Sequence, residues 1–237
     1  MTDRSFIRVT EMILSTPFGP LIYVAWGRHD ALIGFALAER WWDITHTFHF
    51  PWGEVGITPL DFTMLTCMSV GAGDIVLFDE SLEMFEVAEM YFPSHEVPSH
   101  MRLHGSDFGS GGIRCSWFTD RYLKFLKEQP ADYAIPVDVM YEHVRAFLFY
   151  YIGQCFFKTG TSHIRLGWLR CVLDIQLMHT FDWGGVILSH LYLGLDMAVR
   201  AGRRLGSLSG FIVILPVCKL FSILIYLSRK FILLDTY

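Results

Sequence analysis

The stretch that most constrains the fold of this chain lies at residues 45–62 and reads THTFHFPWGEVGITPLDF. Polar and aromatic side chains alternate in its first half, which places Phe48 and Phe50 together on one face of a strand. A Pro-Trp-Gly turn follows, in which Gly53 can adopt the left-handed backbone that closes the turn. The next residues return as a second strand. The sequence therefore predicts an antiparallel β-hairpin over residues 46–57.

A helix start follows the hairpin directly. Thr58 is predicted to be the N-cap, Pro59 suits the first helical position, and Asp61 completes a capping-box pattern. The helix is expected over residues 60–70, and the side chains expected to point inward are Leu60, Met64, Leu65 and Met68.

Elsewhere the apolar pattern is mostly helical. Residues 137–157 have apolar side chains on almost every side, which predicts a central, buried helix. Asp30 and Asp182 are expected to cap two further helices. The remaining expectations are helices over 31–42, 116–129 and 183–205, a short loop and helix over 160–175, an irregular arm over 1–29, and a long loop over 92–114. The expected fold class is mainly α (α-rich α+β), a helical domain with a small antiparallel β-hairpin.

The composition supports a folded chain in a reducing compartment. Hydrophobic residues make up 52% of the 237 residues and aromatic residues 16%, which is ample material for a core. The five cysteines have no close pair, which argues against a disulfide framework. The N-terminus does not have the pattern of a secretory signal.

Charge is distributed unevenly along the chain. Residues 1–120 contain 16 acidic and 6 basic residues (−10), and residues 121–237 contain 8 and 13 (+5), which together give the net charge of −5. The acidic excess centres on 74–96. Such a run is usually a solvated face, and the alternative is a docking surface for a basic partner.

The C-terminal segment 211–228 is strongly apolar, with Lys219 as its one charged residue and Pro216 as a helix-kinking residue. A membrane span needs about 20 apolar residues, and a central lysine costs about 2.5–3.5 kcal/mol on insertion scales. We expect a buried terminal helix or a poorly packed end, with a membrane-inserted tail as the alternative.

Histidines and cysteines suggest two metal sites, both weak. His46 and His49 are three residues apart in an extended segment, which directs their side chains to opposite faces and disfavours a shared ion. His100 and His104 have a better spacing for zinc, with Cys115 nearby, but no Cys-x-x-Cys pair accompanies them. No metal is expected.

No catalytic or cofactor motif is convincing. The segment GQCFFKTG, from Gly153, ends like a P-loop but has Phe157 in place of the second glycine and follows a helical pattern. A pyridoxal phosphate site would need a lysine, and Lys124 and Lys127 fall on an amphipathic helix, where solvent exposure is the ordinary interpretation. We expect no cofactor and no enzymatic activity.

Basic residues near the C-terminal end of the helix expected over 183–205 raise a nucleic-acid alternative. Arg200, Arg203 and Arg204 form the cluster, with Arg165 and Arg170 as further candidates for phosphate contacts. The sequence pI of about 6.0 makes this weak evidence for a nucleic-acid-binding surface, and a solvated helix end is the competing interpretation.

Several blocks resemble the plant mobile domain, the domain of maintenance-of-meristems-like proteins that is also labelled aminotransferase-like. The blocks lie in family order within residues 30–206: ERWWDITHTFHFPWGEVGITPLDFTMLTCMSVGAG, YIGQCFF, RLGWLRCVLD and HTFDWGGVILSHLYLGLDMAVR. The resemblance divides the chain into an N-terminal arm (1–29), the domain (30–206) and a divergent apolar C-terminal tail (207–237), as in a truncated or transposon-derived copy.

The resemblance implies a nuclear protein that acts in gene or transposon silencing and meristem maintenance, with a phosphatase-like protein as a partner. It supplies no catalytic residues. We therefore expect a non-enzymatic interaction module, with membrane attachment and nucleic-acid binding as alternatives. The block expected to organise it comprises Arg40, Trp41, His46, Phe48, His49, Phe50, Trp52, Gly53 and Glu54, with Trp42 beside it. Its aromatic rings are expected to pack against the neighbouring helices.

Overall fold

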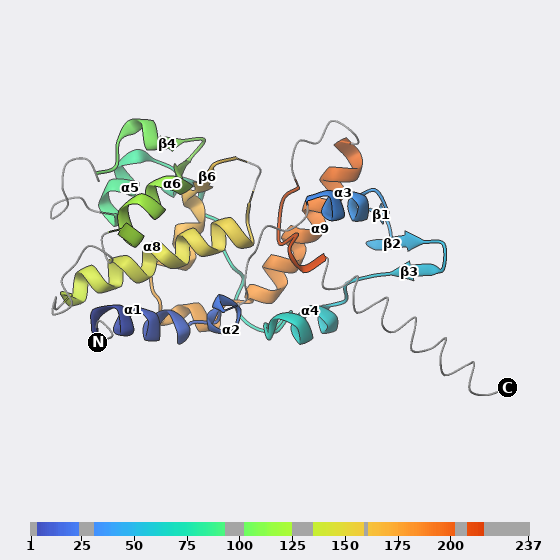
Figure 1. Cartoon of the computed structure of the whole chain (residues 1–237), viewed down its shortest axis with the longest axis horizontal. Helices are drawn as coiled ribbons and strands as arrows, with labels where there is room; N and C mark the ends of the chain where they lie inside the picture. Colours follow the sequence, from blue (N-terminus) through green and yellow to red (C-terminus); the bar gives the residue numbers. More distant parts are fainter. Residues whose placement is uncertain are drawn as a thin grey trace.

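The computed structural model describes residues 4–23, 31–92, 102–124, 135–158, 161–201 and 208–215. The described residues are mainly helical and form two small three-stranded antiparallel sheets, which confirms the expected fold class. The sheets lie at opposite ends of an elongated body, one near β4 and β6 and the other at β1–β3 (Figure 1).

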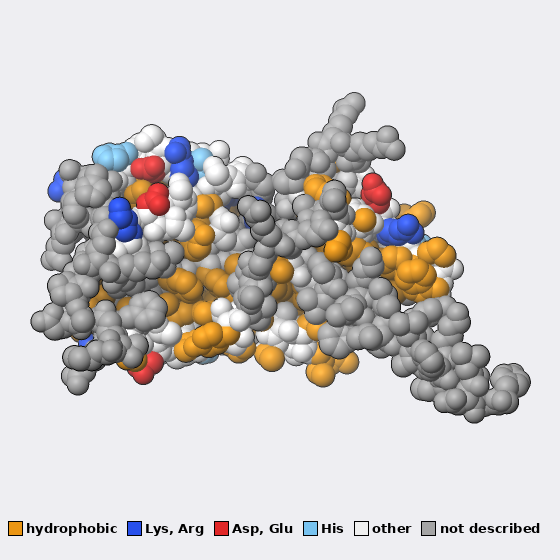
Figure 2. Space-filling view, in the orientation of Figure 1, with side chains coloured by type: hydrophobic (Ala, Val, Ile, Leu, Met, Phe, Trp, Pro, Cys, Tyr) orange, Lys and Arg blue, Asp and Glu red, His pale blue; other side chains and the backbone are white. Residues whose placement is uncertain are grey.

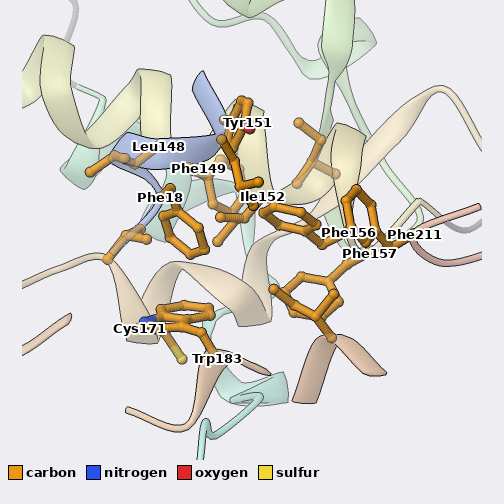
Figure 3. Close-up of a cluster of buried hydrophobic side chains, with 14 of the residues drawn as sticks. Phe18, Leu148, Phe149, Tyr151, Ile152, Phe156, Phe157, Cys171, Trp183 and Phe211 are labelled. Atoms are coloured by element: carbon orange, nitrogen blue, oxygen red, sulfur yellow. The ribbon is translucent and has the colours of Figure 1, made fainter. Parts of the chain in front are cut away.

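The central helix is α8, Val137–Cys155, and it confirms the expectation of a buried helix in this part of the chain. Leu148, Phe149 and Ile152 are fully buried. Phe156, directly after the helix, lies with its ring centroid 5.5 Å from that of Phe18. Figure 3 shows these rings together in the main core.

Two helices lie within residues 4–23, so the expectation of an irregular arm over 1–29 was wrong for this part, and residues 24–29 lie outside the described residues. Helix α1 spans Arg4–Leu14 and α2 spans Gly19–Ile22. Apolar residues recur at helical spacing in α1, and Val9 and Ile13 are buried where α1 packs on α8. The turn-rich sequence between the helices does bend the chain, and it places Phe18 in the core.

Helix α3, Ala31–Ala38, ends four residues earlier than expected, and Asp30 lies outside the described residues. The two tryptophans that were assigned to this helix instead form strand β1, Trp41–Trp42. Strands β2, Thr47–Phe50, and β3, Gly53–Val55, form the expected hairpin. Trp41 pairs with Phe48 and Phe48 pairs with Val55, so β1 extends the hairpin to three strands.

Helix α4, Pro59–Thr66, has the capping box that the sequence predicts, with the Thr58 hydroxyl accepting a hydrogen bond from the Asp61 amide. The predicted inward face was wrong for two of its four members, because Leu60 and Met64 are exposed. Phe62 and Thr66 are buried instead. Apolar residues surround this short helix, so its periodicity does not select a face, and the large ring of Phe62 takes the inner position.

Segments expected to be loop or helix form the second sheet. Strands β4, Phe108–Gly109, β5, Gly112–Arg114, and β6, His163–Arg165, pair antiparallel. Elements η1, Glu80–Leu82, and α5, Phe85–Tyr91, precede the expected long loop, and η3, Gly105–Asp107, interrupts it. Helix α6, Cys115–Phe118, continues into the π-helical η4, Thr119–Leu123, where a helix was expected. The expected helix after residue 163 is a strand followed by the 3₁₀ segment η5, Leu166–Cys171.

Helix α9, Trp183–Ala201, follows the 3₁₀ segment η6, Leu177–Thr180, and runs from the main core toward the hairpin (Figure 1). The prediction that Asp182 caps it is confirmed: Asp182 Oδ1 accepts a hydrogen bond from the Gly185 amide at 2.8 Å. Trp183 is buried, and its indole Nε1 donates to the Met178 carbonyl at 2.8 Å.

Residues 208–215 cross α9 and enter the core, where Phe211, Ile212, Ile214 and Leu215 are buried. The crossing is close at Gly194, because a Cβ there would lie 2.3 Å from the carbonyl oxygen of Ser209. Residues 216–228, which contain most of the apolar segment, lie outside the described residues. Among the helices that are described, none has the length and apolarity to cross a membrane.

The buried imidazole of His143 makes stability depend on pH. His143 is 6% exposed, and burial lowers its pKa from 6.5 to about 4, an effect reinforced by the nearby charge of Arg121. The folded protein therefore holds a neutral imidazole where the unfolded chain binds a proton. This penalty is absent above pH 6.5, grows as pH falls, and is complete near pH 4. We expect wild-type protein to lose roughly 1 kcal/mol of unfolding free energy through this group between pH 7.5 and pH 5.5.

Urea unfolding of His143→Gln at both pH values measures this effect. The variant should lose roughly 1 kcal/mol less than the wild type, whereas the exposed control His179→Gln should follow the wild type. An equal loss in wild type and His143→Gln would show that this imidazole is not the titrating group.

Candidate interaction surface around the hairpin

The inner side of the hairpin packs on α9. Trp41 and Phe48 are 3% and 4% exposed, and their ring centroids are 4.8 Å apart. The Trp41 indole Nε1 donates to Asp196 Oδ1 at 2.7 Å, and the Trp41 ring also contacts the ring of Tyr192. Burying an indole N–H without a partner is costly, so Asp196 satisfies the one polar atom of this aromatic contact.

His46 and Tyr192 complete this contact. The His46 ring stacks on Tyr192 at a centroid distance of 5.2 Å, and its Nε2 lies 3.4 Å from Asp196 Oδ2. The Tyr192 hydroxyl donates to the carbonyl oxygen of Ile57, which follows β3 at the open end of the hairpin. Burial raises the pKa of Tyr192, which keeps this hydroxyl protonated as a donor. One turn of α9 thus holds both ends of the hairpin.

Two stacked aromatic pairs lie outside the contact with α9: Trp42 and His49 on the outer face of the sheet, and Phe50 and Trp52 at the turn end of the hairpin. Trp42 is 51% exposed, and its ring stacks on His49 at 5.1 Å. Trp52 is 49% exposed and lies parallel to Phe50, with the ring centroids 4.7 Å apart. Arg40 places its guanidinium carbon 5.9 Å from the centre of the Phe50 ring. We define the hairpin surface as Arg40, Trp42, His49, Phe50, Trp52 and Glu54.

The expectation for the aromatic block was therefore correct for its inner members and wrong for its outer ones. Trp41 and Phe48 pack against α9, whereas Trp42 and Trp52 are half exposed and Phe50 is partly buried. For Trp42 the reason is the alternation of side chains along a strand: because Trp41 faces the core, Trp42 must face outward. Phe50 shares the face of Phe48, and it is partly buried against the core beside the turn. Figure 2 shows hydrophobic side chains beside charged ones at this end of the molecule. Gly53 has a φ of +140°, as the turn prediction required.

The two hairpin histidines serve different contacts and do not converge. His46 precedes β2 with a φ of +52° and faces α9, whereas His49 lies on the outer face with its Nε2 3.8 Å from Glu54 Oε1. Among the described residues, no group of three His, Cys, Asp or Glu side chains is placed to hold a metal ion. His104 is exposed, and His100 lies outside the described residues. The Cys115 sulfur accepts a hydrogen bond from the side-chain amide of Gln154, and burial raises the pKa of the Cys115 thiol.

Two of the arginines proposed for nucleic-acid contacts are engaged with carboxylates. Arg200 Nε lies 3.1 Å from Asp43 Oδ2. Arg165 makes a two-pronged contact with Glu83, at 2.9 Å and 2.7 Å, and lies over the ring of Phe78. Glu83 is therefore a paired member of the acidic stretch, not a purely solvated one. Arg203 and Arg204 lie outside the described residues.

Sequence reasoning missed Tyr192 and Asp196, which hold the hairpin. A signal was present, because Tyr192, Asp196 and Arg200 recur at intervals of four and so form one stripe of α9. That stripe was assigned no partner, since the apolar pattern alone does not indicate which distant segment contacts a helix face.

The family model described as "Plant mobile domain" matches residues 24–224. The chain is 28% identical over 169 residues to Protein MAIN-LIKE 2 of Arabidopsis thaliana, which covers 69% of this chain and 22% of that protein. It is 28% identical over 186 residues to Protein MAINTENANCE OF MERISTEMS of Arabidopsis thaliana, covering 77% and 35%.

A third relative is the Serine/threonine-protein phosphatase 7 long form homolog of Arabidopsis thaliana, 27% identical over 196 residues, with 82% of this chain and 13% of that protein covered. The chain thus spans no more than about a third of the length of these relatives. No solved structure matches the chain.

The adjacent tryptophans of β1 provide a matched test of the hairpin geometry. We expect Trp41→Ala to lower the free energy of unfolding by about 3–5 kcal/mol, because it removes a buried ring and leaves Asp196 without its strongest donor. Trp42→Ala should cost about 1 kcal/mol or less, since half of that ring is already in water. Chemical denaturation monitored by far-UV circular dichroism measures both. Equal costs for the two variants would contradict the assigned inner and outer faces.

Proposed function

Because this chain belongs to the plant mobile domain family, we propose that it is a non-enzymatic interaction module whose hairpin surface binds a protein partner. The proposed role is the one that the family resemblance implies: the protein acts in the nucleus, in gene or transposon silencing and in meristem maintenance. The proposed partner is a phosphatase-like nuclear protein.

The observation that supports this proposal most is the state of Trp42 and Trp52. Both rings are about half exposed, yet each is held in one orientation by a stacked neighbour. Tryptophan is enriched among the residues that dominate binding energy at protein interfaces. A ring that is already ordered loses less conformational entropy on binding, so more of its contact energy contributes to affinity.

The chemistry around these rings also suits a protein partner. Arg40 and Glu54 place opposite charges beside the two stacked pairs, and His49 adds a ring nitrogen. An aromatic centre with polar and charged groups at its rim is the usual composition of a protein interface. The seating of the hairpin on α9 fixes these groups relative to the body of the domain.

Binding to a nuclear partner can be tested with surface variants of the full chain. We expect a phosphatase-like protein to co-purify with the tagged wild type from plant nuclear extract and to be lost with the Trp42→Ser/Trp52→Ser variant. The matched control is Leu60→Ser/Met64→Ser, which removes two even more exposed apolar side chains from α4 and should retain the partner.

Direct titration of the purified partner should then show affinity reduced at least tenfold for the tryptophan variant alone. Retention of the partner by the tryptophan variant, or its equal loss from the control, would contradict the proposed surface. A fluorescent fusion that fractionates with membranes and resists alkaline extraction would contradict the nuclear assignment.

A further inference from the structure

Strand β3 is the open edge of the hairpin sheet. The strands follow in the order β1-β2-β3, and within the described part of the chain no strand pairs with the far side of β3 (Figure 1). The opposite edge differs, because β1 contacts α9 and Trp41 is buried there. On β3, Gly53 and Glu54 are both exposed, and a Cβ added at Gly53 would meet no atom within 4 Å. The edge of β3 is therefore accessible to another chain.

The hydrogen bonds of β2 show which way its main-chain groups point. In an antiparallel sheet the N–H and C=O of one residue point to the same neighbouring strand, and successive residues alternate between the two neighbours. The His49 amide donates to the Arg40 carbonyl at 2.8 Å, so His49 is bonded toward β1. Phe48 and Phe50, on either side of it, are therefore bonded toward β3.

Glu54 is the residue of β3 whose main chain faces the open edge. Phe48 and Phe50 pair with Val55 and Gly53, so these two residues of β3 direct their polar groups toward β2. Glu54 lies between them and therefore directs its N–H and C=O away from β2. An added strand would form hydrogen bonds with both groups, which is how extended peptides join the edges of sheets.

The side chain of Glu54 selects the charge of an added strand. In the register of the sheet, Arg40 lies opposite His49 and His49 lies opposite Glu54. The Glu54 side chain is 57% exposed, and its carboxylate has His49 Nε2 at 3.8 Å but no ion pair with a lysine or arginine of the described residues. Opposite charges directly across two strands stabilise the pairing, and like charges weaken it. The position opposite Glu54 therefore favours lysine or arginine.

We propose that the partner protein contributes an extended segment that pairs with β3 as a fourth strand and carries a basic side chain opposite Glu54. This inference rests on the proposed function, because Glu54 belongs to the hairpin surface. The neighbouring residue of the segment is apolar, since the open space beside Gly53 can be filled by a larger side chain. A second copy of this chain is a poor occupant, because pairing two β3 edges would bring two Glu54 carboxylates into the same interface.

Nuclear magnetic resonance on the purified, isotope-labelled full chain tests this pairing with synthetic peptides. The probe is a short peptide of alternating threonine and valine with a central arginine, and its counterpart has a central glutamate. We expect the arginine peptide to shift the Glu54 amide resonance saturably, and to bind at least about threefold more tightly than the glutamate peptide. The Val55 amide, which is directed toward β2, should shift less. No saturable shift of the Glu54 amide up to roughly 10 mM arginine peptide would overturn the proposal.

Three substitutions of Glu54 locate the contact, followed through the Gly53 amide. Glu54→Pro removes the outward N–H, which makes no bond to β2, and Glu54→Gln is its matched control because it loses the same charge but keeps the N–H. The arginine peptide should bind Glu54→Pro at least about threefold more weakly than Glu54→Gln. Glu54→Lys should reverse the preference between the two peptides, and it decides the test if Glu54→Pro does not fold. Equal binding by the proline and glutamine variants, or an unchanged preference in Glu54→Lys, contradicts the paired strand.

The same variants separate this inference from the proposed function. A nuclear partner that is lost with Trp42→Ser/Trp52→Ser but retained by Glu54→Pro and Glu54→Lys would overturn the paired strand and leave the proposed function standing. The peptide titration needs no nuclear partner, so its result decides the paired strand even if none co-purifies. A doubled mass of the purified chain in light scattering that Glu54→Pro abolishes would overturn the choice of partner in favour of a second copy.

Discussion

The arrangement of this domain depends on the carboxylate of Asp196. Its side chain is only 13% exposed, yet it meets the Trp41 indole at 2.7 Å, the His46 ring at 3.4 Å and the Arg200 guanidinium at 4.0 Å. A carboxylate withdrawn from water is tolerated only where donors compensate it. These donors come from the strand, the turn after it and the next turn of α9, so satisfying one charge fixes the position of the whole sheet on the helix.

Helix α9 connects the hairpin to the rest of the molecule. The ring centroid of its first residue, Trp183, lies 4.8 Å from that of Phe18 in the main core, and Asp182 caps the N-terminus of the helix. Asp182 also accepts a hydrogen bond from the Gly71 amide, which ties the loop after α4 to the same helix end. The helix therefore connects the aromatic core around α8 to the hairpin, and the exposed rings of the hairpin surface are held by a rigid support.

Local signals predicted the elements whose determinants are close in sequence. The hairpin, the capping box at Thr58, the cap at Asp182 and the buried helix α8 all have turn, cap or periodicity signals within a few residues, and the structure contains each of them. The second sheet was not predicted, because β5 pairs with β6 across about fifty residues and each strand is three residues long. The inner face of α4 and the partner of Asp196 depend on packing between distant segments, which no local pattern specifies.

The crossing of residues 208–215 over α9 is made by the main chain, since the carbonyl of Ser209 rests against Gly194. A contact of this kind places a strict size limit on the helix position, and the crossing segment has a limit of its own at Gly210, where φ is +85° and a Cβ would lie 3.0 Å from the His190 carbonyl oxygen. A larger residue at position 194 would therefore push the segment away from α9. The route of residues 208–215 through the fold therefore depends on two glycines, one on each side of the crossing, and neither position has room for a larger side chain unless the two backbones separate.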